Sequence, residues 1–210
     1  MRELLPQLYV ILDRPTADAA GVDLVDVVHA SARAGARLFQ VRDKATSSRD
    51  LLALSRRVLE AAWHYPDVFV LINDRADVAR IVGADGVHLP ASGLPLDEVR
   101  LMLGGRTAVI ACSVHDEVEL AAAAEGGASF ATVSPIYPTS SKPGYGPALG
   151  PDVFARLAPL APDLPLYALG GLTPERARAC IARGAHGAAA MSSIISDPAL
   201  AAAFPHDTII

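Results

Sequence analysis

Four neighbouring residues carry groups that can bind phosphate. Three hydroxyls and one ammonium stand side by side on Thr139, Ser140, Ser141 and Lys142. Hydroxyls donate hydrogen bonds to phosphoryl oxygens, and lysine adds a compact positive charge. They lie in residues 134–150, which are rich in proline and glycine and exceed the roughly 2 to 6 residues of an ordinary β-to-α connection. The segment fits a phosphate-binding loop, and a solvated proline-rich lid would have the same composition.

A second group of candidate anion ligands ends a short apolar run. Because side chains alternate along a strand, we expect Gln40, Arg42 and Lys44 on one side of it, near its end. Two cations and an amide facing one way are costly beside an apolar core unless they meet an anion. The structural alternative is an ion pair of Arg42 with Asp43 or Asp74.

Two carboxylates are candidate metal ligands. Asp74 follows one apolar run, and Asp85 opens the next. Mg²⁺ is typically held by one or two carboxylates together with substrate phosphates. Taken singly, Asp74 could begin a helix and Asp85 could cap a turn. Taken together with the cations at Arg42 and Lys44, they predict a site for a diphosphate and Mg²⁺.

A hydroxyl and an imidazole end a further apolar run. Ser113 could donate a hydrogen bond there, and His115 could act as an acid or base near neutral pH. His115 also stands directly before Asp116, where it could simply begin a helix. His88 lies inside an apolar run, and we expect it to be a core residue with satisfied hydrogen bonds.

A second phosphate site is predicted towards the end of the chain. Gly170 and Gly171 precede a helix start, where bare glycine amides can bind phosphate. Met191 and Ser192 follow the last apolar run. In (β/α)₈ barrels a phosphate site commonly lies at the loops after strands seven and eight.

The elements that would position these residues alternate along the whole chain. Continuous apolar runs separated by helical patterns predict parallel strands that are buried on both faces. Strands are expected at 9–13, 38–42, 68–73, 86–89, 108–113, 130–134, 166–170 and 187–191. Helices are expected near 23–34, 48–63, 76–82, 95–102, 116–125, 151–158, 174–183 and 198–204. Eight such units predict a single (β/α)₈ TIM barrel domain over residues 1–210.

Composition narrows the classes of function. The chain has 210 residues, 51% of them hydrophobic, and a formal net charge of −5. This charge argues against a general nucleic-acid or membrane surface, although an acidic protein can still hold a local basic pocket for small phosphorylated substrates. Cys112 and Cys180 sit in apolar segments without metal-site spacing, so we expect two buried free thiols. No apolar run approaches the length of a membrane span. We therefore expect a cytoplasmic protein, which could form a homodimer.

Several of these motifs together resemble the thiamine-phosphate synthase superfamily. They are Gln40-Val41-Arg42-Asp43-Lys44, Asn73-Asp74-Arg75, Ala84-Asp85-Gly86-Val87-His88-Leu89, Ser113-Val114-His115, Pro135-Ile136-Tyr137-Pro138-Thr139 with Ser141-Lys142, and Gly170-Gly171. The resemblance implies condensation of hydroxymethylpyrimidine diphosphate with hydroxyethylthiazole phosphate, carboxylated or not, with release of diphosphate. In this family diphosphate leaves first, and the thiazole nitrogen then captures a pyrimidine-stabilised cation.

The resemblance also implies roles for individual residues. The pyrimidine diphosphate would be bound by Gln40, Val41, Arg42, Asp43, Lys44, Asn73, Ser113 and Lys142. The thiazole phosphate would be bound by Thr139, Ser140, Ser141, Gly171, Met191 and Ser192. Mg²⁺ would be held by Asp74 and Asp85, and the catalytic residues would be Lys142 and Ser113, with His115 mainly in the alternative described next.

One departure from the synthase pattern keeps two alternatives open. Synthases usually continue Val87-His88-Leu89 with Gly-Gln and an acidic residue, whereas here residues 90–93 are Pro-Ala-Ser-Gly, as in the thiazole tautomerase branch. A tautomerase acts on the carboxylated thiazole phosphate and needs neither diphosphate nor Mg²⁺. Because burying unneeded charges is expensive, Arg42, Lys44, Asp74 and Asp85 favour the synthase. A non-catalytic protein that binds phosphorylated ligands of thiamine metabolism is the second alternative.

Overall fold

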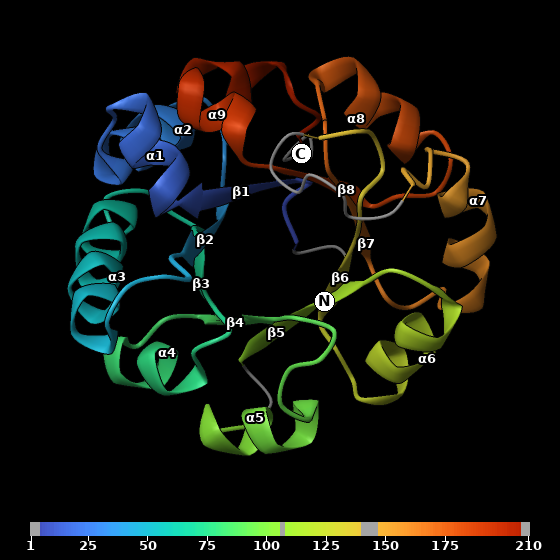
Figure 1. Ribbon diagram of the computed structural model, residues 1–210, viewed down its shortest axis with the longest axis horizontal. Helices are drawn as coiled ribbons and strands as arrows, with labels where there is room; N and C mark the ends of the chain where they lie inside the picture. Colours follow the sequence, from blue (N-terminus) through green and yellow to red (C-terminus); the bar gives the residue numbers. More distant parts are fainter. Residues whose placement is uncertain (1–4, 106–107, 140–146, 207–210) are drawn as a thin grey trace.

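The computed structural model describes residues 5–105, 108–139 and 147–206. Parallel strands β1 to β8 close into a barrel in sequence order, and the helices form a ring around it (Figure 1). The sheet closes where β1 pairs with β8, with Leu8 opposite Ala188 and Val10 opposite Ala190. The predicted (β/α)₈ barrel is confirmed, whereas a single domain over residues 1–210 stays a prediction.

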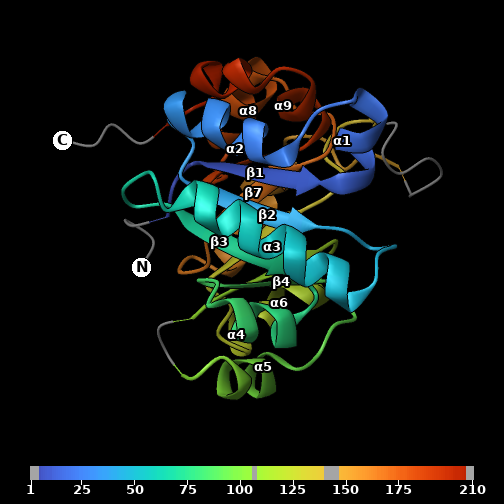
Figure 2. The same ribbon diagram turned by 90° about the vertical axis from the view of Figure 1, so that its left-hand side faces the viewer.

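All eight predicted strands are present, and their ends differ from the expected ones by at most one residue. They are β1 (Leu8–Asp13), β2 (Leu38–Arg42), β3 (Phe69–Asn73), β4 (Gly86–Leu89), β5 (Val109–Val114), β6 (Phe130–Val133), β7 (Leu166–Leu169) and β8 (Gly187–Ala190). The arrowheads of β1 and β2 point the same way in Figure 2. The face where the carboxyl ends of the strands meet is called the mouth below.

The helices agree with the prediction less completely. They are α1 (Arg14–Ala20), α2 (Leu24–Arg33), α3 (Ser48–Ala62), α4 (Ala76–Val82), α5 (Leu96–Met102), α6 (Glu117–Glu125), α7 (Val153–Leu157), α8 (Pro174–Ile181) and α9 (Ser192–Ser196), with 3₁₀ helices η2 (Ala158–Leu160) and η3 (Pro198–Ala203). Helices α1 and α9 were not predicted. The helix expected near 198–204 is the 3₁₀ helix η3. Within the described residues, no helix is both long and apolar enough to cross a membrane.

The alternation of side chains on each strand builds two apolar clusters. On β1, Leu8, Val10 and Leu12 pack outward beneath the helices, and Tyr9 and Ile11 pack inside the barrel. Strands that are buried on both faces need continuous apolar sequence. This is why the apolar runs located the strands so closely, and why polar residues inside the barrel stand out.

Candidate active site

The ends of β1 and β2 hold a buried ion pair at the mouth. Asp13 stands opposite Arg42 in the strand register and forms a salt bridge with it. The other carboxylate oxygen of Asp13 accepts hydrogen bonds from the Thr16 amide at 3.2 Å and the Thr16 hydroxyl at 2.6 Å. The bond from the amide makes Asp13 the N-cap of α1. Arg42 is therefore paired, as the structural alternative anticipated, but its partner is Asp13 rather than Asp43 or Asp74.

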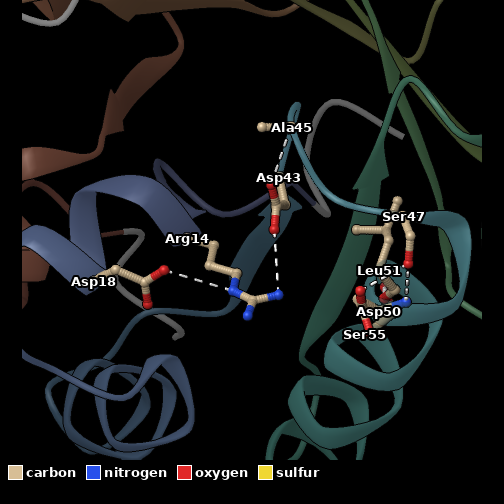
Figure 3. Close-up of polar contacts among 8 residues, drawn as sticks. All are labelled: Arg14, Asp18, Asp43, Ala45, Ser47, Asp50, Leu51 and Ser55. Carbon is tan, nitrogen blue, oxygen red and sulfur yellow. Dashed lines mark hydrogen bonds and ion pairs between the residues drawn. The ribbon is translucent and has the colours of Figure 1, made fainter.

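Asp43 is held by a different arginine. Arg14, the first residue of α1, lies 3.5 Å from an Asp43 carboxylate oxygen and 3.7 Å from one of Asp18 (Figure 3). The other Asp43 oxygen accepts from the Ala45 amide at 3.2 Å. Asp43 thus ties the segment after β2 to α1, while Lys44 beside it is exposed to solvent.

Gln40 lies inside the barrel, below the mouth, and is 2% exposed. Its amide nitrogen donates to the Tyr9 hydroxyl at 2.6 Å, and the Tyr9 hydroxyl lies 3.2 Å from His88 Nδ1. Because the Tyr9 oxygen already accepts from Gln40, its proton can go to His88. Burial raises the pKa of Tyr9 above its ordinary value, so the phenol keeps this proton. Gln40 therefore lies deeper in the barrel than Lys44, which is exposed, and its part in an anion site stays a prediction.

The hydrogen-bonded chain continues from His88 to the hydroxyl of Ser113. His88 Nε2 lies 3.1 Å from Ser113 Oγ, and the Thr132 hydroxyl donates to the same oxygen at 3.5 Å. If Nδ1 accepts from Tyr9, Nε2 carries the His88 proton and donates it to Ser113. Ser113 then accepts from both neighbours, which leaves its own proton free to be donated elsewhere. The prediction that His88 is a satisfied core residue is confirmed, since it is 4% exposed.

The two predicted metal ligands lie at opposite ends of the barrel. Asp74 follows β3 at the mouth, where its amide donates to the His88 carbonyl at 2.8 Å. Asp85 precedes β4, and its carboxylate accepts from the Val70 amide at 2.7 Å. Val70 lies four residues before Asp74, which at strand spacing is about 13 Å. The expectation that Asp74 and Asp85 share one Mg²⁺ is therefore wrong, because Asp85 belongs to the amino-terminal face.

Asp74 fits a metal site better than the other carboxylates near it. It is exposed and takes a left-handed backbone conformation (φ 61°), which is uncommon outside glycine. Asp13 and Asp43 are occupied by Arg42 and Arg14. No three histidine, cysteine, aspartate or glutamate side chains gather closely enough to hold a metal ion in the part of the chain that the structure describes. A cation here could complete its coordination with water and with oxygens of a bound substrate.

His115 has the helix-start role that was considered for it. Its backbone amide and its Nδ1 atom lie 2.7 Å and 2.8 Å from one carboxylate oxygen of Glu119. Asp116 in turn accepts from the Glu119 amide at 2.8 Å and caps α6. This is a close variant of the capping box, with the glutamate reaching back one residue further. His115 thus stabilises the start of α6 at the edge of the mouth.

The segment after β6 packs against the turn after β7. The Ile136 and Tyr137 amides donate to the carbonyls of Leu169 at 2.9 Å and Gly170 at 3.1 Å. Arg176 from α8 lies over the Tyr137 ring at 4.5 Å. Strand register puts Leu169 opposite Ala189, so the residues that follow, including Gly171, continue at the level of Met191 and Ser192. Two of the proposed phosphate-binding segments are thus adjacent.

Gly171 has no room for a side chain, and we expect Gly171→Ala to show this as lost stability. A Cβ there would lie 2.6 Å from the Pro138 carbonyl oxygen, at φ +62°. Gly21 offers a matched control, because its φ is +67° and nothing lies within 4 Å of its Cβ position. Urea unfolding should give a loss of about 1 to 2 kcal/mol for Gly21→Ala from backbone strain alone. Gly171→Ala should cost about 1 to 3 kcal/mol more, from overpacking; equal losses would contradict the crowding.

The remaining predicted residues divide into two groups. Ser140, Ser141 and Lys142 lie outside the described residues, whereas Asn73, Thr139 and Ser192 are partly exposed near the mouth. Sequence reasoning missed Tyr9, Asp13, Thr132 and Ser134. Asp13 was detectable, because it ends a predicted strand just as Arg42 does. The arrangement brings cations, hydroxyls and an exposed carboxylate to one face, which suits a ligand that carries phosphate groups.

Comparisons with known proteins agree with this geometry. Residues 8–194 match the family model described as thiamine monophosphate synthase. The chain is 36% identical to the thiamine-phosphate synthase of Methanospirillum hungatei, covering 93% of each protein, and 38% identical to that of Chlorobium luteolum, covering 90% of this chain and 85% of the relative. The solved structure of thiamine phosphate pyrophosphorylase from Pyrococcus furiosus superposes with a TM-score of 0.81 at 24% identity, covering 96% of this chain and 93% of that one.

Proposed function

Because the chain belongs to the thiamine monophosphate synthase family, we propose that it joins hydroxymethylpyrimidine diphosphate to hydroxyethylthiazole phosphate, carboxylated or not, and releases diphosphate. The observation that carries this is a match to synthases over nearly the whole chain, with strand-end motifs of the kinds that the reaction needs. The direct test is to incubate the protein with both substrates and Mg²⁺ and to look for thiamine phosphate. Absence of product with a folded protein would overturn the proposal.

The reaction asks the protein to stabilise a leaving group rather than to supply a nucleophile. The bond between the pyrimidine methylene carbon and the diphosphate oxygen breaks, and both electrons leave with the oxygen. The lone pair of the thiazole nitrogen then forms the new carbon–nitrogen bond. Positive charge and hydrogen-bond donors aimed at the departing oxygens lower this barrier. Arg42 and the Ser113 hydroxyl, both near the mouth, would serve this purpose together with Lys44, Asn73 and Lys142.

Gln40 has a different role in this proposal from the one that the resemblance implied. It touches Tyr9, not the mouth, so it would act as a positioning residue. By donating to Tyr9, Gln40 sets the direction of donation in the hydrogen bonds from Tyr9 to His88 and from His88 to Ser113. The Ser113 proton would then be free to be donated to the diphosphate. Asp43 would likewise act indirectly, by holding the segment after β2 against Arg14.

Mg²⁺ would be held at the mouth by Asp74 together with oxygens of the substrate. One carboxylate is enough when substrate phosphates supply further ligands. When bound, the ion would add positive charge beside the diphosphate. On the other side of the mouth, Gly171, Met191, Ser192 and Thr139 would bind the thiazole phosphate. The packing of residues 136–138 on the β7–α8 turn supports this grouping.

Replacing His115 distinguishes the synthase from the tautomerase. Tautomerisation needs proton transfer, to which a positioned acid or base contributes about 10² to 10⁴-fold. The ionising step of the condensation needs none, so His115→Asn should reduce the condensation rate by less than about tenfold. Lys142→Ala should reduce it by about 10² to 10³-fold, as the loss of one charge-stabilising donor does. Both rates are measured as diphosphate release under saturating substrates.

One set of results would establish the alternative branch. A wild-type protein that forms no thiamine phosphate, yet isomerises the carboxylated thiazole phosphate in a manner that depends on His115, would be a tautomerase. Because His115 contacts Glu119 at the start of α6, replacing His115 could lower activity by disturbing the helix rather than by removing an acid or base. Glu119→Gln serves as the control, because it perturbs the same helix start and leaves the imidazole in place.

A further inference from the structure

One buried hydroxyl at the mouth has no hydrogen-bond partner among the described residues. Ser134 is 4% exposed, and its Oγ atom is unsatisfied. Only its backbone is engaged, with the amide 3.4 Å from the Val114 carbonyl. Buried hydroxyls in folded proteins nearly always have a partner, and an exception calls for an explanation such as a bound ligand.

The alternation along β6 gives the direction of this side chain. Phe130 packs inside the barrel, and Thr132 donates to Ser113 there. Ala131 and Val133 pack outward beneath the helices. Ser134 directly follows β6, and its amide continues the ladder to Val114. The same alternation would put its side chain on the inner face, one layer above Thr132.

The neighbours of Ser134 place it between the two phosphate-binding regions. On one side, the register of β5 and β6 sets Ser113 opposite Thr132, so Ser134 lies diagonally above Ser113. On the other side, Pro135 approaches the turn after β7, where its Cα atom lies 3.2 Å from the Cβ position of Gly170. The Ser113 proton and the Ser134 hydroxyl are both available on this side of the mouth.

We propose that Ser134 is a substrate-binding residue whose hydroxyl donates to a phosphoryl oxygen of the pyrimidine diphosphate, next to Ser113. This rests on the proposed function for the identity of the ligand. A hydroxyl in a buried position makes a short, strong hydrogen bond to an anionic oxygen. The diphosphate is chosen over the thiazole phosphate because Ser134 continues the β5–β6 ladder and lies above Ser113.

Ser31 provides a matched control for the test. Its Oγ atom is also buried and unsatisfied, but it lies on α2, in the outer layer. Ser134→Ala and Ser31→Ala therefore remove the same group with the same burial. Neither change should lower the thermal unfolding temperature, because a buried polar group without a partner is replaced by a methyl group.

The experiment is calorimetric titration of both variants with inorganic diphosphate plus Mg²⁺ and, separately, with hydroxyethylthiazole phosphate. We expect Ser134→Ala to raise the Kd for diphosphate about 10- to 100-fold, the value of a hydrogen bond to a charged group. Its Kd for the thiazole phosphate and both constants of Ser31→Ala should match the wild type. An unchanged diphosphate Kd would overturn the proposal, as would a loss confined to the thiazole phosphate.

The proposed function and this proposal fail in different ways. If wild-type protein makes thiamine phosphate but Ser134→Ala binds diphosphate normally, the role of Ser134 is wrong and the function stands. If wild-type protein binds diphosphate with Mg²⁺ but forms no product, the function is wrong and the diphosphate titration still decides on Ser134. A lower unfolding temperature in Ser134→Ala alone, with unchanged binding, would make the hydroxyl structural and overturn the proposal.

Discussion

Asp13→Ala is expected to destabilise the protein by about 3 to 5 kcal/mol and to remove most of its turnover. The substitution leaves the Arg42 guanidinium, which is largely buried, without its partner, and this is the costly way to break a buried ion pair. It also removes the N-cap of α1, a loss of about 1 kcal/mol. Without Asp13, Arg42 is no longer oriented at the mouth. Urea unfolding and the rate of diphosphate release measure the two effects.

Asp23 supplies the control for Asp13. It also caps a helix, α2, by accepting from the Val25 amide at 2.8 Å, and it also pairs with an arginine, Arg57, at 2.7 Å. Both members of that pair are exposed, so Asp23→Ala should cost only about 1 to 2 kcal/mol from the cap and a weak ion pair. Turnover should not change. A loss for Asp13→Ala no larger than that for Asp23→Ala would refute the importance of the buried pair.

A double variant separates stability from chemistry at this pair. Asp13→Asn combined with Arg42→Gln replaces two charges by two amides that can bond to each other. Removing both partners of a buried pair is generally far less costly than removing one. The double variant should therefore unfold close to the wild type while remaining nearly inactive, since the cation for the diphosphate is gone. Recovered turnover would mean that Arg42 serves only the fold.

Asp74→Asn is expected to abolish most Mg²⁺-dependent condensation, whereas Asp85→Asn should leave it nearly intact. The two residues lie at opposite ends of the barrel. Asp74 lies at the mouth, whereas Asp85 lies at the amino-terminal end of β4, where its carboxylate accepts a hydrogen bond from the Val70 amide. An asparagine at 85 can still accept that hydrogen bond. The expected loss for Asp74→Asn is about 10² to 10³-fold, similar to removing one electrostatic contact to the leaving group. The measurement is diphosphate release at increasing Mg²⁺ concentration.

The dependence on Mg²⁺ concentration gives the sharper criterion. A weakened metal site should shift the activating concentration of Mg²⁺ upward for Asp74→Asn and not for Asp85→Asn. Normal turnover and normal activation in Asp74→Asn would remove the metal assignment. A large loss in a stably folded Asp85→Asn would mean that the chemistry is not confined to the mouth.

The strands were predictable because their signal is local. Each is a continuous apolar run, as burial on both faces requires, and each is separated from the next by a helical pattern. Helices α1 and α9 are short, with 7 and 5 residues, and only one residue separates α9 from the end of β8. Helix α1 also follows β1 without any intervening loop. Its one available signal was Asp13 followed by Pro15, an N-cap with proline in the first turn.

The site was predictable in its residue types and less so in their pairing. The strand-end rule located Arg42, Asp74 and Ser113, because chemistry in such barrels gathers at the carboxyl ends of the strands. The same rule, applied strictly, excludes Asp85, which opens its strand. The Asp13–Arg42 pair depends on the register of two strands, and no local pattern encodes register across 29 residues. His88 was assigned correctly to the core, but its link to Tyr9 and Ser113 required the closed barrel.

The two cysteine thiols are buried, as expected, and this bears on the chemistry at the mouth. Cys112 lies on the outward face of β5, where burial raises the pKa of its thiol to about 12. Cys180 lies on α8 and is fully buried, which also raises the pKa of its thiol. Thiols kept protonated and out of contact with solvent are poor nucleophiles.

The proposed reaction would form a pyrimidine-stabilised cation, which is an alkylating agent and would have to survive until the thiazole nitrogen reaches it. The strongest nucleophile that a protein can offer such a species is a thiolate. Here both cysteines belong to the apolar cluster between the strands and the helices, outside the barrel interior, and burial keeps them as thiols. In the proposed reaction, the burial of the two cysteines would keep their sulfur atoms from reacting with this cation.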